Sequence, residues 1–321
     1  MQEIQITEQE AGQRLDKLLA KYLNLAPKSF FYKMLRKKNI TLNGKKAAGN
    51  EKLAKGDCVK LFLSDETIQK FSEVFSEYTE EELDILYEDS DVILINKPVG
   101  MLSQKASSAD QSLVEHLISY LVRSGALTEE DLKTFRPSIC NRLDRNTSGI
   151  VAAGKTMAGL QALNQLFHDR SIGKYYLCLA KGEIRSSSRA EGWLKKDSDT
   201  NQVEILKQEV PESVYIATEY RPIKSNHGVT LLEVHLITGK THQIRAHLAS
   251  LGHPLIGDPK YGDARINQEY RKRYQVRSQL LHAARLKFPI CEGALKEVSQ
   301  KEFQAPLPDL FLRIVKEQGV Q

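Results

Sequence analysis

The chain has 321 residues, of which 41% are hydrophobic and 27% are charged, and it carries a net charge of +5. This composition is typical of a globular protein in water, and the length favours one large domain with a smaller one beside it. No apolar run approaches the roughly 20 residues that span a bilayer, and residues 1–5 lack the pattern of a signal peptide. We therefore expect a soluble protein without membrane contact.

The cysteines lie far apart and show none of the paired spacings that disulfide frameworks and zinc sites have. They are Cys58, Cys140, Cys178 and Cys291. We expect neither disulfides nor zinc, and this usage fits the reducing cytoplasm as the location.

The charges are unevenly distributed along the chain. Residues 11–63 hold 13 Lys and Arg against three Asp and Glu, a net charge of +10, whereas residues 64–91 hold 11 acids against Lys70, a net charge of −10. Such asymmetry indicates a module that binds a polyanion, followed by an acidic linker over residues 64–82. A charged surface that only faces solvent is the alternative.

Within residues 11–63 the apolar positions predict two helices and a hairpin. Residues 14–23 carry one apolar stripe, and Pro27 precedes a second amphipathic helix over residues 28–38. Asn43 and Gly44 form a hairpin-turn signal, and residues 58–63 are typical of a strand. The expected unit is a compact αα-β fold.

The order RLDKLLAKYLNLAPKSFFYKMLRKKNITLNGKK in this segment resembles the S4-type RNA-binding domain, which is named after a small-subunit ribosomal protein. In that family the second helix and the adjacent hairpin contact structured RNA. The resemblance implies RNA contacts by Lys28, Lys33, Arg36, Lys37, Lys38 and Lys45. Lysine and arginine bind phosphates without reading the base sequence, so this module would dock the protein on RNA.

Residues 83–321 predict a second, larger domain of α+β class. The predicted strands cover residues 85–87, 92–95, 150–155, 174–180, 216–220, 229–236 and 280–288, and the predicted helices cover residues 112–124, 156–170, 242–251 and 309–316. Residues 183–211 are expected to form a loop and an irregular hairpin. Mostly adjacent strand pairs with a few helices favour a mixed, largely antiparallel sheet flanked by helices.

The stretch from Asn141 to Gly149 contains the first candidate for chemistry. Asp144 lies between Arg142 and Arg145 in a predicted loop, and a carboxylate among arginines keeps its charge at neutral pH. That suits a nucleophile or a base better than a proton donor. A loop aspartate that caps a turn is the common alternative.

Two further side chains draw attention. Tyr176 shares one face of its predicted strand with Lys174, opposite the apolar face that carries Tyr175, although packing is the usual role of a strand tyrosine. Arg245 lies at the edge of the buried stripe of the helix that Thr241 is expected to cap. An arginine there needs a carboxylate or phosphate partner.

We expect neither a metal nor a cofactor. The spacing of His242, His247 and His253 places them on different helix faces, with no ligand to complete a site. The chain also lacks a phosphate-binding glycine loop, a dinucleotide fingerprint and a nucleophile elbow.

Four segments occur in an order that resembles the RluA family of pseudouridine synthases. They are the Asp144 loop, GKYYLCLAKG, TGKTHQIRAHLASLGHPLIGDPKYG and LLHAARLKF. The resemblance covers residues 83–290. With the basic module of residues 11–63 in front, the chain is most similar to the C and D members of the family, which modify 23S ribosomal RNA. It implies that uracil is detached from its ribose at N1, rotated and reattached through C5, without a cofactor.

The resemblance also assigns residues. Asp144 becomes the catalytic carboxylate, Arg245 its ion partner, and Tyr176 the residue that lies against the uracil and helps to remove the C5 proton. Leu281 is expected to line the uracil pocket, and Arg142 is left to contact the RNA substrate.

Asn141 departs from the family, which commonly has His there, and a structural or RNA-contacting role is expected for it. A monomer is expected. The alternatives are a synthase acting on tRNA and a ribosome-assembly factor that binds RNA without catalysis. A glycoside hydrolase is a weak third alternative, because this sequence has no second carboxylate in a matching motif.

Overall fold

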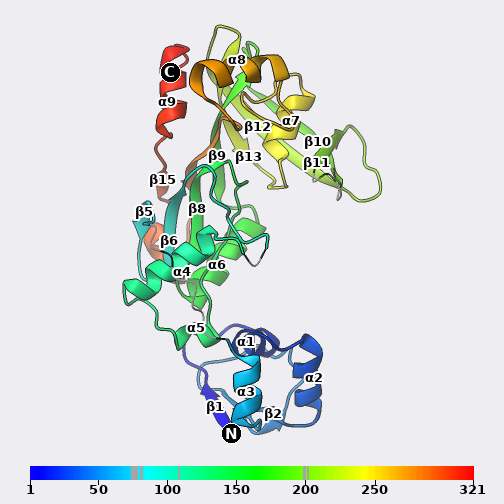
Figure 1. The fold of residues 1–321 in the computed structure, drawn as a ribbon, viewed down its shortest axis with the longest axis vertical. Coiled ribbons are helices and arrows are strands. Elements are labelled where there is room, and N and C mark those ends of the chain that lie inside the picture. Colours follow the sequence, from blue (N-terminus) through cyan, green and yellow to red (C-terminus); the bar gives the residue numbers. More distant parts are fainter. Residues whose placement is uncertain (74–78, 80–81, 108, 198–199, 201) are drawn as a thin grey trace.

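The computed structural model describes residues 1–73, 79, 82–107, 109–197, 200 and 202–321. Two sheets with separate cores divide these residues into a small N-terminal domain and a large domain, at opposite ends of Figure 1. The sheet of the small domain has the strand order β1-β4-β2-β3. Its strands are β1 (Gln2–Gln5), β2 (Ile40–Leu42), β3 (Lys45–Lys46) and β4 (Cys58–Leu61).

Helices α1 (Leu15–Tyr22) and α2 (Lys28–Arg36) place their apolar stripes in one core with this sheet. The domain also includes β1 and α3 (Asp65–Phe71), which lie outside residues 11–63. Ile68 of α3 is buried in the core, so the first part of the expected acidic linker packs on the small domain. Much of the remaining linker, residues 74–78 and 80–81, lies outside the described residues.

The small domain contacts the large one through α5 (Asp131–Thr134). The side-chain amide of Gln13 donates to the carbonyl oxygen of Thr134 at 3.2 Å, and the Thr134 hydroxyl donates to Glu10 Oε1 at 2.8 Å. Both contacts are buried. Direct hydrogen bonds therefore join the two domains.

The sheet of the large domain has 11 strands in the described residues, with the path β11-β10-β12-β13-β9-β14-β8-β6-β5 and with β15 and β7 beside β14 and β8. Its pairs are antiparallel except for β14 and β8, which confirms a mixed, largely antiparallel sheet. The strands are β5 (Ile85–Glu88), β6 (Val92–Lys97), β7 (Ser138–Ile139), β8 (Ser148–Gly154), β9 (Gly173–Lys181), β10 (Ser188–Asp197), β11 (Gln202–Leu206), β12 (Ser213–Asn226), β13 (Val229–Leu236), β14 (Leu281–Lys287) and β15 (Glu302–Gln304).

Helices flank this sheet (Figure 1). They are α4 (Leu113–Arg123), α6 (Met157–His168), α7 (Gln243–Ser250), α8 (Ala264–Tyr274), the short 3-10 helix η1 (Gly293–Val298) and α9 (Asp309–Glu317). Ser112 and Glu115 form a capping box at α4, and Thr156 caps α6 as predicted. In the part of the chain that is described, no helix has the length and apolar character needed to cross a membrane.

Several local predictions were wrong. The buried face of β9 carries Lys174, Tyr176, Cys178 and Ala180, whereas Tyr175 and Leu177 on the other face are only partly buried. Tyr175 there stacks on the His235 ring and under the Arg285 guanidinium and not in the apolar core. The residue before α7 is His242 in the left-handed conformation (φ +53°), so Thr241 is not the cap. Leu251, expected in the buried stripe, is 43% exposed. The strand β15 after residues 280–288 was not predicted.

The parallel contact between β8 and β14 fixes the chain next to the Asp144 loop. Gly149 has φ +109°, and a Cβ atom there would lie 2.2 Å from the carbonyl oxygen of Ala283, so only glycine fits. One residue earlier, Ser148 Oγ is hydrogen-bonded to His282 Nδ1 at 2.9 Å, and His282 Nε2 lies 3.2 Å from the carbonyl oxygen of Ala305. His282 is fully buried, and burial lowers its pKa to about 4.

This histidine predicts a pH dependence of stability. Unfolded His282 binds a proton near pH 6.5, whereas the folded protein binds it only near pH 4, so its contribution is present above pH 6.5 and is lost as the pH falls toward 4. Between pH 7.5 and 5 we expect about 2 kcal/mol of the free energy of unfolding to be lost through this group. Urea unfolding at several pH values measures it. In His282→Asn the loss of unfolding free energy between pH 7.5 and 5 should be smaller by that amount. Equal losses in both proteins would contradict the assignment.

Candidate active site

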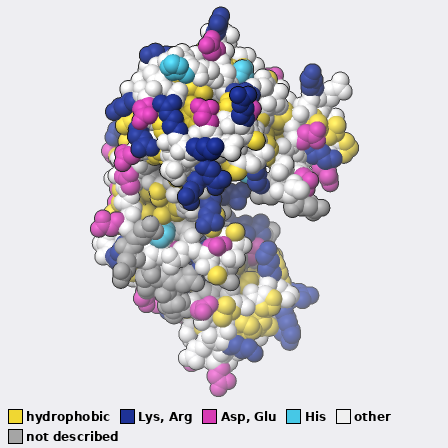
Figure 2. Space-filling view, turned by 45° about the horizontal axis from the view of Figure 1, so that its top comes forward, with side chains coloured by type: hydrophobic (Ala, Val, Ile, Leu, Met, Phe, Trp, Pro, Cys, Tyr) yellow, Lys and Arg dark blue, Asp and Glu magenta, His cyan; other side chains and the backbone are white. Residues whose placement is uncertain are grey.

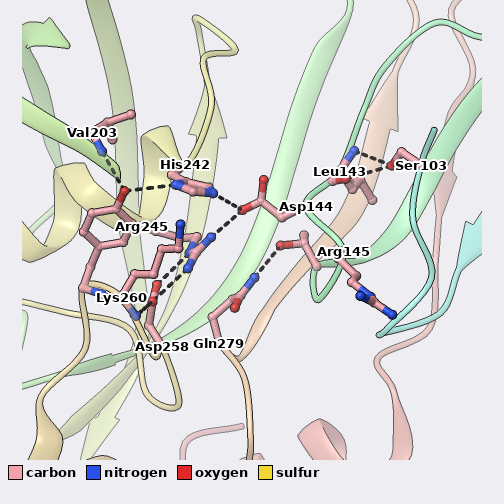
Figure 3. Close-up of polar contacts among 12 residues, drawn as sticks. Ser103, Leu143, Asp144, Arg145, Val203, His242, Arg245, Asp258, Lys260 and Gln279 are labelled. Atoms are coloured by element: carbon pink, nitrogen blue, oxygen red, sulfur yellow. Dashed lines mark hydrogen bonds and ion pairs between the residues drawn. The ribbon is translucent and has the colours of Figure 1, made fainter. Parts of the chain in front are cut away.

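Asp144 lies in the loop that leads into β8, and hydrogen bonds fix the loop on both sides of it (Figure 3). The backbone N–H of Leu143 donates to Ser103 Oγ at 3.0 Å, and Ser103 Oγ donates to the Leu143 carbonyl at 2.8 Å. On the other side, Gln279 Nε2 donates to Thr147 Oγ1 at 3.2 Å. The loop is therefore held by residues distant in the sequence, and the Asp144 side chain remains 27% exposed.

Lys97 supports the same loop. It is fully buried, and its ammonium donates to the carbonyl oxygens of Pro98 (2.9 Å), Met101 (2.8 Å) and Arg145 (3.2 Å). Burial lowers the pKa of Lys97 to about 7, while the charge of Asp144 opposes this shift. Three carbonyls from two segments thus converge on one lysine, and the end of β6 is joined to the Asp144 loop.

Arg245 is the ion partner of Asp144. Its Nη1 donates to Asp144 Oδ2 at 2.8 Å, although the two residues are 101 positions apart. Its Nε and Nη2 donate to the two oxygens of Asp258 at 2.7 and 2.9 Å, a bidentate pair. Arg245 is buried, and the two carboxylates keep its pKa raised against the effect of burial.

Asp258 was not predicted from the sequence, because Gly257 to Gly262 has the pattern of a turn. Its side chain is fully buried, and its Oδ1 also accepts the backbone N–H groups of Lys260 (2.8 Å) and Tyr261 (3.1 Å). These donors outweigh burial and lower its pKa, so it is ionised. The sequence feature that could have revealed Asp258 is its place in a turn that follows the helix of Arg245, an arginine that needs a carboxylate partner.

Only one oxygen of Asp144 is held by these groups. Arg245 binds Oδ2, and His242 Nε2 lies 4.0 Å from the same atom. Oδ1 has no hydrogen-bond partner among the described side chains (Figure 3). The geometry therefore leaves Oδ1 as the oxygen available to a substrate.

His242 belongs to a second chain of contacts that the sequence did not reveal. The Tyr261 hydroxyl accepts the backbone N–H of Val203 at 2.9 Å and lies 3.0 Å from His242 Nδ1 (Figure 3). The hydroxyl is thus free to donate to Nδ1, which leaves the proton of a neutral imidazole on Nε2, facing Asp144. Burial lowers the pKa of His242 and favours this neutral form.

Tyr176 and Leu281 come from neighbouring strands and are both buried, 8% and 5% exposed. In β9 and β14, Tyr176 lies opposite Ala283 and Leu281 lies opposite Cys178. Burial first, and then the charge of Asp144, raises the pKa of Tyr176, so its hydroxyl is neutral at physiological pH. Leu281 shares the apolar cluster of Tyr176 beside the ion pairs.

The other residues singled out around Asp144 have different surroundings. Arg142 and Arg145 are exposed, and Arg145 Nε donates to the carbonyl oxygen of Gly100 at 3.0 Å. Among the described residues the arginine paired with Asp144 is the distant Arg245 and neither neighbour in the sequence. Asn141 has a structural role: its Nδ2 donates to the Ile150 carbonyl at 3.1 Å and its Oδ1 accepts the N–H of Ala152 at 2.8 Å.

The six basic candidates of the small domain are all exposed, and none has a carboxylate partner among the described residues. They are Lys28, Lys33, Arg36, Lys37, Lys38 and Lys45. By contrast, Arg14, Lys55 and Lys60 form ion pairs within the same domain. Figure 2 shows Lys and Arg side chains along one side of the small domain, and others on the large domain beside the recess that separates the two.

The remaining histidines of the sequence cluster have ordinary partners. His247 Nδ1 lies 3.0 Å from Thr218 Oγ1, and His253 Nδ1 lies 3.0 Å from the carbonyl oxygen of Lys181. In the ranges that the structure describes, no group of three His, Cys, Asp or Glu side chains could hold a metal ion.

Comparisons with known proteins identify the class to which this site belongs. Residues 91–250 match the family model of RNA pseudouridylate synthases. The chain is 30% identical to the ribosomal large subunit pseudouridine synthase C of Vibrio vulnificus, over 98% of this chain and 96% of that protein. It is also 30% identical to an uncharacterized RNA pseudouridine synthase of Mycoplasma genitalium, over 97% and 98% of the two chains.

A human RNA pseudouridylate synthase domain-containing protein 4 has the same fold, with a TM-score of 0.59 and 21% identity over 73% of this chain and 92% of that one. This structural likeness shows the fold. Because the chain aligns over nearly its whole length with relatives that are 30% identical, it is an RNA pseudouridine synthase, an isomerase that acts on RNA. It belongs to the RluA family, as its motifs predicted.

The buried ion pairs predict that Asp258 matters for stability as well as for the site. In Asp258→Asn the guanidinium of Arg245 loses its bidentate partner and stays buried, which should cost about 3 kcal/mol of the free energy of unfolding. Urea unfolding measures the loss. Asp263→Asn is the control, because its partner Lys181 stays in contact with water, and it should lose far less. Equal losses in the two variants would contradict a special role for Asp258.

Proposed function

We propose that the protein converts uridine to pseudouridine in 23S ribosomal RNA, with Asp144 as the catalytic carboxylate. The observation that carries the proposal is the Asp144 side chain, held through Oδ2 by Arg245 while Oδ1 is left open. Support for the substrate comes from relatives in several Vibrio species that are named ribosomal large subunit pseudouridine synthase C and that align over nearly their whole length.

The reaction exchanges one bond of the same nucleotide for another. The C1′–N1 bond breaks, the C1′–C5 bond forms, C5 loses its proton and N1 gains one, so no atom is taken from a co-reactant. Asp144 acts as a carboxylate that the guanidinium of Arg245 holds through Oδ2. Tyr176 and Leu281 form the buried wall against which the uracil packs, and the neutral hydroxyl of Tyr176 assists the proton transfer from C5.

The uridine has to leave its stack to reach Asp144 at the base of the loop. Extrusion of a base costs a few kcal/mol, which contacts to the RNA backbone offset. Arg142 is exposed two residues from Asp144 and contacts the RNA that carries the extruded uridine. The site thus combines an apolar wall for the base with cations for the phosphates.

The Asp144→Asn variant tests the catalytic role. Its side chain keeps the size of aspartate but loses the charge, so we expect the release of tritium from C5 of labelled uridine in RNA to fall by at least about 10³-fold. RNA affinity should change by less than about twofold, because Asp144 makes no phosphate contact. Asp169→Asn, at the exposed end of α6, is the matched control and should retain full activity. Substantial activity in Asp144→Asn would refute the assignment.

The substrate is tested in cells that lack the protein. A position-resolved map of pseudouridines should lose one or more sites in 23S ribosomal RNA. Loss confined to tRNA would favour the tRNA alternative, and an unchanged map together with no tritium release would favour a non-catalytic assembly factor. Any RNA in which the sites disappear should regain them with the wild-type protein and not with Asp144→Asn.

We further propose that the small domain, built on residues 11–63 with β1 and α3 packed onto them, is an S4-type module that docks the enzyme on RNA. The rest of the acidic stretch, up to residue 82, would link it to the catalytic domain of residues 83–321, and the enzyme would act as a monomer. The unpaired cations on and after α2 support the docking role, since a free cation can neutralise a phosphate without first breaking an ion pair.

Neutralising three of these cations tests the docking surface. In a Lys33→Gln, Lys37→Gln, Lys38→Gln protein the KM for RNA should rise about tenfold or more while kcat stays unchanged, because only lysines that bind phosphates are altered. The slope of log affinity against log salt should become shallower by roughly 0.7–0.9 for each phosphate that is no longer neutralised. Lys55→Gln with Lys60→Gln, whose lysines are paired with acids, is the control. A larger change in the control would show that the wrong surface was chosen.

A further inference from the structure

Two lysines are buried in the described residues, and they differ in one respect. Lys97 is fully buried with three carbonyl acceptors around its ammonium. Lys174, in β9, is 8% exposed; its stem is packed, and its ammonium has no hydrogen-bond or ion-pair partner among the described residues but is not sealed from water. Lys181, at the other end of the same strand, is bonded to Asp263 at 2.7 Å. The fold therefore supplies no partner for the charge of Lys174, whose ammonium keeps contact with solvent.

The surroundings of Lys174 are cationic. The charged group that acts on it is Arg170, and burial together with this second cation lowers the pKa of Lys174 to about 8. Lys240 is exposed in the loop before α7, next to Gly239. The Lys174 ammonium lies 3.6 Å from the point where a Cβ of Gly239 would be, so the loop passes close to it. An anion could enter here without displacing a native partner.

The position of Lys174 ties it to the active site in two ways. It lies on the same face of β9 as Tyr176, two residues away, which corresponds to about 7 Å along a strand. Gly239 precedes His242 by three residues, and the His242 ring flanks Asp144. The same short loop therefore borders the catalytic carboxylate at one end and the uncompensated lysine at the other.

We propose that Lys174 binds a phosphodiester group of the RNA strand next to the extruded uridine, with Arg170 and Lys240 at the rim of the site. This inference rests on the proposed function, which places the uracil against Tyr176. The distance from Tyr176 to Lys174 is comparable to the size of a nucleotide, so a base on the first and its phosphate on the second can belong to one strand.

The energetics of burial favour a ligand over a packing role for Lys174. Partial desolvation of the Lys174 ammonium is unfavourable, and a methionine of similar length would fill the same space without that penalty. A fold that retains the unpaired ammonium gives up stability at this point. Such a loss of stability is the usual mark of a side chain kept for function.

The Lys174→Met variant tests the proposal, with Lys174→Arg as the conservative form and Lys181→Met as the control from the same strand. For Lys174→Met we expect the KM for 23S ribosomal RNA to rise about tenfold, the salt slope to become shallower by roughly 0.7–0.9, and the melting temperature to stay equal or to rise. Lys174→Arg should restore the KM to within about threefold. Lys181→Met should leave KM and salt slope unchanged.

Two results would overturn the proposal. An unchanged KM and salt slope in Lys174→Met would show that the ammonium contacts no phosphate. A lower melting temperature with a reduced kcat and an unchanged KM would show that Lys174 only supports the fold.

Binding in the Asp144→Asn background separates this proposal from the proposed function. If wild-type protein releases no tritium from any RNA, the proposed function fails, but the effect of Lys174→Met on RNA affinity is still measurable in Asp144→Asn protein. Inorganic phosphate serves as a second probe. If millimolar phosphate perturbs the Lys174 ammonium signal in NMR while Lys174→Met binds RNA normally, the site takes a free anion and the RNA contact is wrong.

Discussion

The site depends on one guanidinium that faces two carboxylates. Asp258 accepts two parallel hydrogen bonds from Arg245, which fixes the plane of the guanidinium, and Asp144 accepts one from the remaining nitrogen. Two negative charges against one positive charge leave the group with a net negative charge. The deeper carboxylate is fully buried and the other is 27% exposed, so the surplus charge is placed where water and substrate can reach it.

The fold brings this group together from segments far apart in the sequence. Asp144 precedes β8, Arg245 lies in α7, and Tyr176 and Leu281 lie on β9 and β14, strands that are paired to each other at the centre of the sheet. In the proposed function these paired strands form the wall for the base, and their ladder of backbone hydrogen bonds holds both side chains in place. The Asp144 loop is less regular, and it obtains its rigidity from single side chains such as Lys97 and Ser103.

The sequence revealed the residues that belong to ordered motifs and missed those whose role arises from contacts. Asp144 and Arg245 were recognised because each is an unusual charge in its local setting. Asp258 stands in a Gly-Asp-Pro turn, where aspartate is common, so local sequence could not distinguish a buried ligand of Arg245 from a turn former. Tyr261 was missed for the same reason. The buried face of β9 was misassigned because the more apolar pair, Tyr175 and Leu177, lies on the partly buried face, while the buried face carries Lys174 and Tyr176.

The two kinds of cation in this protein fit two different tasks in binding a polyanion. In the proposed function the exposed lysines of the small domain bind phosphates, which gives affinity that depends on salt and carries little positional information. A lysine whose stem is packed in a strand, as Lys174 is, has few conformations left and can accept an anion at only one point. The RNA affinity that the exposed lysines would provide can offset the free energy needed to extrude a base. In the proposed function, a phosphate fixed at Lys174 decides which base is extruded, because it places the neighbouring uridine against Tyr176.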